Sequence, residues 1–441
     1  MKVPPFLLIL LVGSTPILLV ALILSASSVE LVAWRPPIAW SEEYGTLGGE
    51  IDNSVNAVAA GGSGVFAVGY VNTPVSGNAT SGSLFVRSYD LAGNMGWTHD
   101  QQSVYFDQFS GISVGNDGVY IVGNLNNSVA VLKFDLNGTR LWTRQIGSFN
   151  SNNRGIGIFS TSTGEYVTGT IYPPITNQTF TGIVMFVREY DPSGNVIWTS
   201  EFSNSTNTFL KGIYANSSGV YILADGLQIG GFLVRYDLNG NVLWNISGGG
   251  IGISGDESAV YVARLSQFNR FTLPPLGVLT KYNSDGNAIW TVQFDVADHS
   301  GVEDPQVSAD SSGVYLAVRS IFGHVYLFKF DSQGSQVWSF QPPLFRTSTT
   351  FSSSIAVSPG RLYVGGSLRT ASAHSLAFLE DIAKDGSLIF LGLQPPWSIV
   401  LIVGTGAFVT INIFLHLRRR RQLRRSGVEP LNRIPLGVPK D

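Results

Sequence analysis

Short runs in which apolar and polar residues alternate fill most of the chain. The run SLFVRSYD, from Ser83 to Asp90, is one example, and a period of two residues is typical of a β-strand with one buried face. Polar turns rich in Gly, Asn and Asp separate the runs. The pattern therefore predicts many short strands joined by hairpins, and no long helix in the middle of the chain.

A phrase of ten residues recurs along the chain, and YDLNGNVLWN from Tyr236 to Asn245 is its clearest copy. The Asp is expected to cap a tight turn, the Gly to take positive φ, and the strand after the turn to carry the Trp. A degenerate copy, IAKDGSLIFL from Ile382, has Phe390 where the Trp belongs. The other copies are YDLAGNMGWT from Tyr89, FDLNGTRLWT from Phe134, YDPSGNVIWT from Tyr190, YNSDGNAIWT from Tyr282 and FDSQGSQVWS from Phe330.

The spacing of the copies predicts a propeller. Successive copies lie 45 to 56 residues apart, the length that a four-stranded blade needs. A second pair of strands precedes each phrase and often carries a G-V-Y/F motif: Gly64-Val65-Phe66, Gly118-Val119-Tyr120, Gly219-Val220-Tyr221 and Gly313-Val314-Tyr315. Four strands in each of seven repeats predict an all-β, seven-bladed β-propeller over residues 38–393.

The phrase Y-D-x-x-G-N-x-x-W-T, with an upstream S-G-V-Y, resembles the β-propeller repeats of the quinoprotein-like superfamily. The resemblance implies that the Trp at the end of the outer strand packs over a Gly of the neighbouring blade. It leaves the activity open, because this fold carries dehydrogenases, lipoprotein assembly factors and binding modules. The residues given this blade-locking role are Trp40, Trp97, Trp142, Trp198, Trp244, Trp290 and Trp338.

Two segments compete to close the ring. Trp40-Ser41-Glu42-Glu43-Tyr44-Gly45 matches the outer strand that starts at Trp142, although no complete repeat precedes it. We expect this segment to be the outer strand of the last blade, which would remove an exposed sheet edge. The alternative outer strand is Leu388 to Leu393. The Trp40 segment is preferred because it keeps the Trp.

Two apolar segments flank the predicted propeller. Phe6 to Leu24 follows Lys2 and precedes small residues, so residues 1–27 are expected to be a cleaved signal peptide or a retained N-terminal anchor. Residues 397–417, from Trp397 to Leu417, are long enough for a transmembrane helix. The basic run RRRRQLRR follows at once and begins the tail, 418–441.

The distribution of charge predicts the orientation. The tail holds 8 of the 27 Lys and Arg residues and Lys2 is another, which leaves 18 basic against 28 acidic residues in 26–396. Positive residues stay inside, so the tail is expected in the cytoplasm and the propeller outside the cell membrane. The basic run can also contact anionic lipid. Possible glycosylation sites of the exported region are Asn78, Asn126, Asn137, Asn177, Asn204, Asn216 and Asn245.

The connections between strands differ at the two faces of the predicted ring. The turns between third and fourth strands are short and uniform, whereas some second-to-third connections are long, as in 72–82, 172–182 and 266–277. Long loops on a rigid scaffold either bind a partner or are neutral insertions. Both tethers are expected to leave the short-turn face, so the long-loop face would point away from the membrane. Its candidate binding residues are Tyr105, Phe106, Phe109, Phe149, Phe180, Phe268, Arg270 and Phe271.

Several sequence patterns resemble known catalytic or binding motifs but lack the neighbouring residues or elements that those motifs require. The chain has no Cys, which excludes thiolate catalysis and Cys-based metal sites. Gly111 to Gly115 and Gly250 to Gly255 match nucleophile-elbow and dinucleotide patterns, but no helix follows either. Asp237 to Asn241 resembles a calcium loop without its closing Glu, and the acidic cluster Asp298, Glu303 and Asp304 is more typical of a solvated loop.

No cofactor, metal or catalytic residue is therefore predicted. The preferred interpretation is a membrane-anchored extracellular module that binds or scaffolds a protein or glycan on the face distal to the membrane, for example in adhesion or in an envelope, and that does not bind nucleic acid. The alternative is an exported enzyme, a hydrolase or a quinone-dependent oxidoreductase. The enzyme would need acidic, His or Arg side chains that converge on the axis of the ring.

Overall fold

The computed structural model describes residues 38–44, 53–74, 80–102, 107–147, 153–172, 183–204, 208–226, 231–266, 274–342, 349–369 and 375–383. Every regular element in these ranges is a strand. The predicted segments 1–27, 397–417 and 418–441, and Phe390, lie outside the described residues. Within the described ranges, no helix meets the length and apolarity that a membrane span requires. The chain divides into two compact units, Met1–Asp385 and Gly386–Asp441, and the described strands belong to the first.

The strands form seven antiparallel sheets of four, which we number as blades one to seven. Blade one contains β2 (Ser54–Gly61), β3 (Gly64–Pro74), β4 (Thr80–Tyr89) and β5 (Met95–Gln102). Blade two contains β6 (Gln108–Gly115), β7 (Gly118–Leu125), β8 (Ser128–Phe134) and β9 (Arg140–Ile146). Blade three contains β10 (Arg154–Ser160), β11 (Glu165–Ile171), β12 (Ile183–Tyr190) and β13 (Val196–Asn204).

The next blades repeat this order. Blade four contains β14 (Thr208–Asn216), β15 (Gly219–Gly226), β16 (Phe232–Tyr236) and β17 (Val242–Ser247). Blade five contains β18 (Gly252–Asp256), β19 (Ala259–Leu265), β20 (Gly277–Tyr282) and β21 (Ala288–Phe294). Blade six contains β22 (Val302–Asp310), β23 (Gly313–Ser320), β24 (Val325–Phe330) and β25 (Gln336–Phe340). Blade seven contains β26 (Thr349–Ser358), β27 (Arg361–Arg369), β28 (Ser375–Ala383) and β1 (Ile38–Tyr44).

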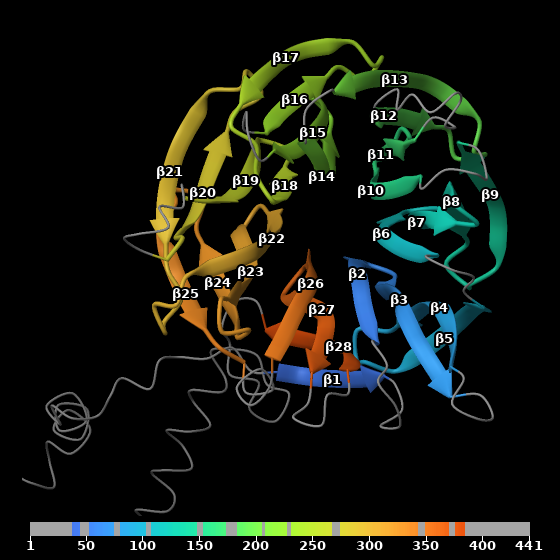
Figure 1. The fold of residues 1–441 in the computed structure, drawn as a ribbon, viewed down its shortest axis with the longest axis horizontal. Coiled ribbons are helices and arrows are strands. Elements are labelled where there is room, and N and C mark those ends of the chain that lie inside the picture. The colour runs from blue at the N-terminus through green and yellow to red at the C-terminus, as the bar shows by residue number, and fades with distance from the viewer. Residues whose placement is uncertain are drawn as a thin grey trace, which may run out of the picture. The chain divides into compact units, whose positions relative to one another are not determined.

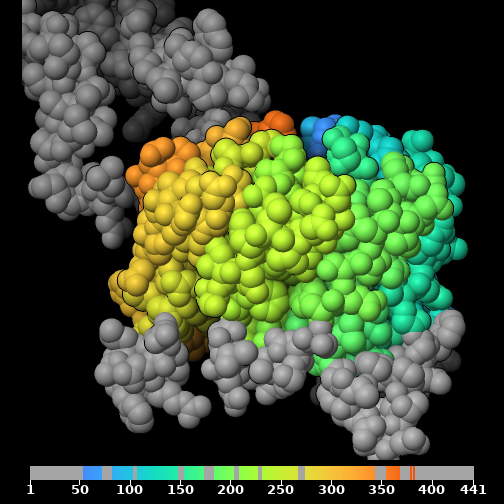
Figure 2. Space-filling view, turned by 90° about the horizontal axis from the view of Figure 1, so that it is seen from above, coloured from blue at the N-terminus to red at the C-terminus, as the bar shows by residue number. Residues whose placement is uncertain are grey.

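The blades stand around a common axis, and the first strand of each blade is the innermost (Figure 1). Each innermost strand contacts the innermost strands of both neighbouring blades, so the ring is closed. Side chains of facing sheets fill the space between blades as apolar clusters, and the outer strands form the wall of the ring (Figure 2). The predicted all-β, seven-bladed propeller of four-stranded blades is confirmed.

The last blade takes its outer strand from the start of the chain. Strand β1 pairs antiparallel with β28, with Ile38 opposite Ile382 and Tyr44 opposite Ala377. The expected closure by the Trp40 segment is therefore confirmed. Because Ile38 and Ile382 are paired, β1 begins where β28 ends, on the face that carries the turns between third and fourth strands.

The Asp of each phrase organises a turn. In blade four, one carboxylate oxygen of Asp237 accepts hydrogen bonds from the backbone N–H groups of Asn239 (2.9 Å) and Asn241 (2.8 Å). The other accepts one from the Asn241 side chain (2.9 Å), and Gly240 has a φ of 83°. These bonds, led by the one from the Asn241 side chain, lower the pKa of Asp237. The carboxylate is occupied by its own turn, so the resemblance to a calcium loop is explained by the turn.

The Trp of each phrase contacts the next blade. The Trp198 indole N–H donates to the carbonyl of Leu238 at 3.0 Å, and a Cβ placed on Gly240 would lie 2.7 Å from the indole ring. The ring lies between Tyr166 of its own blade and Tyr236 of the next, at centroid distances of 6.2 and 6.3 Å. The equivalent Gly and carbonyl contacts are made by Trp97, Trp142, Trp244 and Trp290.

The last two tryptophans of the predicted set differ. The Trp338 N–H is buried and has no hydrogen-bond partner among the described residues. The matching turn, which begins after Ala383, lies outside the described ranges, and so does the side chain of Trp40. The five tryptophans with described partners show why the phrase repeats: the indole fits only where the next blade supplies a Gly at positive φ.

A basic residue just before the aromatic-Asp pair strengthens three of these joints, and sequence reasoning missed it. Lys133 donates to the carbonyl of Pro192 at 2.9 Å, which also accepts the Trp142 indole N–H at 3.1 Å. Arg235 shares the Ser284 carbonyl with Trp244, and Lys281 shares the Ser332 carbonyl with Trp290. One backbone oxygen with two lone pairs thus accepts two bonds from the preceding blade.

Candidate functional site

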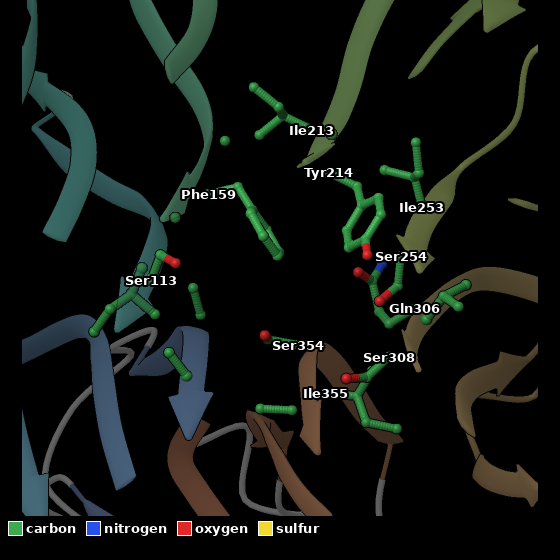
Figure 3. A pocket seen from close by; sticks show the side chains of 18 of the residues that line it. Ser113, Phe159, Ile213, Tyr214, Ile253, Ser254, Gln306, Ser308, Ser354 and Ile355 are labelled. Carbon is green, nitrogen blue, oxygen red and sulfur yellow. The ribbon is translucent and has the colours of Figure 1, made fainter. Parts of the chain in front are cut away.

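A channel runs along the axis of the ring, between the seven innermost strands (Figure 3). Its cavity has a volume of about 390 Å³. Apolar, glycine and hydroxyl side chains supply most of its lining, and Lys211 is the one charged side chain among the described lining residues. Several hydroxyls are already engaged, because Ser113, Ser254 and Ser354 each accept a backbone N–H from a neighbouring blade. The channel therefore has little acid–base capacity.

One position on each innermost strand can be compared between all blades. It is the residue paired with the aromatic of the G-V-Y/F motif or its equivalent, and it faces the next blade beside the channel. We call these seven residues the inner ring: Ala59, Ser113, Phe159, Tyr214, Ser254, Ser308 and Ala356. Five blades place Ala or Ser there, whereas blades three and four place two aromatic side chains next to each other.

The two aromatic residues of the inner ring contact each other. Their ring centroids are 4.9 Å apart and the planes meet at 70°, an edge-to-face arrangement. Tyr214 is 5% exposed and lies across Gly255 of blade five, where an added Cβ would be 2.4 Å from the tyrosine ring. Phe159 is only half-buried and projects into the channel (Figure 3). Burial, followed by the charges of Glu257 and Asp256, raises the pKa of Tyr214, so its hydroxyl stays protonated.

A second and larger cavity, of about 850 Å³, adjoins the channel beside this aromatic pair. Phe159, Ser160 and Tyr214 line both spaces. The turns between first and second strands of blades three to six form the rim of this cavity, which we call the mouth cleft. It opens on the face of the short turns. Sequence reasoning expected recognition on the opposite face, where the connections are long.

The rim of the mouth cleft is acidic and held rigidly. One oxygen of Asp256 accepts the backbone N–H groups of Ser258 (2.7 Å) and Ala259 (3.0 Å), and Glu257 accepts the Ser217 hydroxyl of blade four at 2.7 Å. Asp310 holds the corresponding turn of blade six through Ser312. The one basic residue of the lining is Lys281, which donates to the carbonyl of Ser332 at 3.3 Å.

A buried carboxyl lies behind the rim in blade three. Glu165 is 2% exposed and stands where the six other blades have Val or Leu, directly before the motif aromatic. Burial raises the pKa of Glu165 to about 7, and one of its oxygens has no hydrogen-bond partner. The nearby Lys133 is paired with Asp117 at 2.6 Å instead. Glu165 lines neither cavity, so it cannot contact a ligand in the channel or the mouth cleft.

The acidic cluster on the long-loop face is paired internally. Asp298 contacts the His324 ring at 3.2 Å, and Arg319 contacts both Glu303 and Asp304 at 2.9 Å. The Asp298–His324 pair ties the connection between β21 and β22 to the turn between β23 and β24, and the Arg319 pairs join β23 to β22. Among the described residues, no group of three His, Cys, Asp or Glu side chains could hold a metal ion. Next to His324, Phe322 is 67% exposed, an aromatic that sequence reasoning did not select.

Two predicted site residues are corrected. Phe109 was expected on an exposed loop, but it lies on β6 and is fully buried in the core between blades one and two. Asn216 is unsuited to glycosylation because it is 5% exposed and its side-chain amide donates to the Asp256 carbonyl at 3.0 Å. The strand signal of β6 begins earlier than the loop boundary assigned from the sequence.

Some of the remaining predicted residues are exposed, and the structure does not describe the others. Asn126, Asn137 and Asn245 are exposed, and glycosylation at these sites stays a prediction. The side chain of Asn204 is not described, and the other candidates lie outside the described ranges: Asn78, Tyr105, Phe106, Phe149, Asn177, Phe180, Phe268, Arg270 and Phe271.

Comparison with known proteins places the chain by its fold alone. No protein-family model and no curated protein sequence matches it. Europium-containing methanol dehydrogenase is similar at 10% identity and a TM-score of 0.43, covering 79% of this chain and 93% of that one. A neuraminidase-like protein from A/bat/Guatemala/164/2009 covers 80% and 98% at 10% identity and 0.41. A protein of unknown function from Bacteroides caccae covers 59% and 90% at 11% identity and 0.37.

The propeller fold is shown by the seven four-stranded sheets themselves. At these identities and TM-scores the likenesses transfer neither a family nor an activity to this chain.

Proposed function

We propose that this protein is a membrane-anchored extracellular propeller that binds a partner or ligand at the mouth cleft and does not catalyse a reaction. The observation that carries the proposal is the broken symmetry of the inner ring. Five blades keep a small residue beside the channel, whereas blades three and four present Phe159 and Tyr214 at the floor of the mouth cleft. This departure sets one sector of the inner ring apart from the other five blades, and it coincides with a cavity.

The described lining of the channel and of the mouth cleft gives little support to the alternative that the protein is an enzyme. Catalysis by acid–base or nucleophilic chemistry needs titratable groups with perturbed pKa values that face the substrate. The described channel lining offers Lys211 and the buried Tyr214. The rim carboxylates accept hydrogen bonds, Asp256 and Asp310 from their own turns and Glu257 from blade four. Glu165, whose pKa is the most strongly raised among the acids, is closed off from both cavities.

The membrane placement rests on the sequence and on where the ring is closed. The apolar segment 397–417 and the basic tail predict one span, with the tail inside. Strand β1 begins and β28 ends on the short-turn face, which also carries the mouth cleft.

The absence of Cys allows a direct test of placement and binding. Single cysteines replace Ser311 on the rim, Phe322 on the opposite face and Ser426 in the tail, and a membrane-impermeant maleimide labels intact cells. We expect labelling of Ser311→Cys and Phe322→Cys, and labelling of Ser426→Cys only after permeabilisation. Occupancy of the cleft should slow the Ser311→Cys reaction several-fold on cells relative to purified protein, while Phe322→Cys reacts equally in both. Labelling of the tail on intact cells would refute the topology, and a Ser311→Cys rate that is the same on cells as in purified protein would refute binding at the cleft.

A further inference from the structure

The aromatic pair and its rim also restrict the class of ligand, if the mouth cleft is the binding site proposed above. The geometry points to a neutral, polyhydroxylated ligand, a short saccharide, that places one ring face on Phe159 and its hydroxyls on the rim. The argument uses the charge of the rim, the shape of the aromatic floor and the supply of hydroxyl groups.

The charge of the rim disfavours anions. Three carboxylates, those of Asp256, Glu257 and Asp310, belong to the lining against the single ammonium of Lys281. That ammonium is already committed, since it donates to the Ser332 carbonyl and lies 5.4 Å from the centre of the Tyr261 ring. A phosphate, a nucleotide or an acidic sugar would therefore meet net negative charge without a free cation to compensate it.

The shape of the floor disfavours an organic cation. Recognition of a quaternary ammonium uses several aromatic faces around the charge. Only two rings meet here, and because their planes are inclined at 70° they cannot both present a face to one group. The negative charge of the rim would attract a cation, so the choice between a cation and a neutral ligand rests on the shape of the floor, and choline is one of the probes in the test below.

A saccharide satisfies the remaining features. A pyranose has an apolar C–H face that can cover the half-buried ring of Phe159, and hydroxyls at its edge. Short hydroxyl side chains surround this floor and can accept hydrogen bonds from sugar hydroxyls: Thr161, Ser162, Thr163, Ser217, Ser258 and Ser311. The hydroxyls of Thr161, Ser217 and Ser258 already donate within the rim. The cleft volume of about 850 Å³ falls within the roughly 300–1,000 Å³ typical of small-ligand pockets.

The test compares two matched substitutions in the full chain. Phe159→Ser gives blade three the inner-ring residue of blade two, and Phe322→Ser removes an exposed aromatic from the opposite face as the control. Both proteins are placed in phosphatidylglycerol nanodiscs, which carry neither a sugar ring nor a quaternary ammonium. Saturation-transfer NMR and calorimetry are run with maltotriose, cellotriose, chitotriose and choline as probes.

We expect at least one of the three saccharides to bind, with its C–H face protons receiving the strongest transfer. Phe159→Ser should weaken that binding at least tenfold, and Phe322→Ser should leave it unchanged. Choline binding that depends on Phe159, without saccharide binding, would overturn the saccharide inference and leave the binding function intact. Failure of all four probes would overturn the saccharide inference. If Ser311→Cys also reacts on cells as fast as in purified protein, the binding function is overturned as well. Circular dichroism of Phe159→Ser separates a lost site from a lost fold.

Discussion

The outer and inner strands of the propeller differ in how closely their residues follow the sevenfold repeat. On the outer strands, five tryptophans make one and the same contact with the next blade, down to the carbonyl that accepts the indole N–H. On the inner ring, Ala and Ser give way to Phe159 and Tyr214 in two adjacent blades. In a repeat protein, a constant position serves assembly, and a position that departs in one sector calls for another explanation.

The largest expected effect is the loss of one outer contact. Trp198→Ala removes a large aromatic side chain between two blades together with its hydrogen bond to the Leu238 carbonyl. We expect a loss of about 3–5 kcal/mol in the free energy of unfolding, the cost of truncating a packed aromatic. Urea unfolding of the full chain in nanodiscs, followed by circular dichroism, measures it. Trp198→Phe, which keeps a ring and loses the N–H, should lose only about 1 kcal/mol; a loss equal to that of Trp198→Ala would assign the joint to the hydrogen bond.

Glu165 departs from the repeat inside the core, and it should lower the free energy of unfolding by an amount that depends on pH. The pKa of Glu165 is about 7 in the folded protein, against the ordinary value of 4.5 expected in the unfolded chain. Below pH 4.5 both states are protonated. As the pH rises from 4.5 to 7 only the unfolded chain ionises, so stability falls, and above pH 7 the loss is constant.

Restoring the repeat at this position should recover that stability. Glu165→Val matches Val220 of blade four, and we expect it to raise the free energy of unfolding at pH 8 by about 3 kcal/mol, with little gain at pH 4. Urea titrations at both pH values check the difference. Glu165→Gln, which keeps the volume and cannot ionise, should show the same pH dependence as Glu165→Val. A stability difference between the wild type and Glu165→Val that is the same at pH 4 and pH 8 would contradict the assigned burial of the charge.

The smallest expected effect comes from replacing a glycine at positive φ. It distinguishes the cost of backbone strain from the cost of losing the contact between that glycine and a Trp ring. Gly240 has a φ of 83° beneath Trp198, whereas Gly360 has a φ of 79° with open space around it. Gly360→Ala should therefore lose about 1 kcal/mol through strain alone. Gly240→Ala should lose about 2 kcal/mol or more, since the added methyl also displaces the indole. Thermal denaturation of both variants gives the comparison, and equal losses would show that the Trp joint tolerates displacement.

The parts of the fold that the sequence predicted are those set by local chemistry. The turn at Asp237 and the strand that carries Trp244 depend on residues within one phrase, so repetition of the phrase exposed both the blades and their number. The strand that contains Trp40 was assigned correctly because it carries half of the phrase. Closure by β1 then followed from the need to cover an edge.

The candidate site could not be predicted in the same way. Phe159 and Tyr214 belong to different hairpins, and their equivalence to Ala59 or Ser113 becomes visible only once each inner strand is aligned with the motif aromatic that it pairs. Phe109 was misplaced because an aromatic near a loop boundary has no local mark of burial. One signal was present and unused: blade three has Gly164-Glu165-Tyr166 where blades two, four and six have G-V-Y.

The pairing of β1 with β28 sets an order in time as well as in space. Ile38 and Ile382 are 344 positions apart in the chain, so the first strand to be synthesised is the last to find its partner. At roughly 5–20 residues per second, translation alone delays that meeting by on the order of 17–70 s. During this interval β1 has an unpaired edge, and six blades can assemble before the seventh is complete. A truncated chain that ends before β28 would thus leave its own beginning without a partner, which gives a quality-control system a simple way to recognise unfinished molecules.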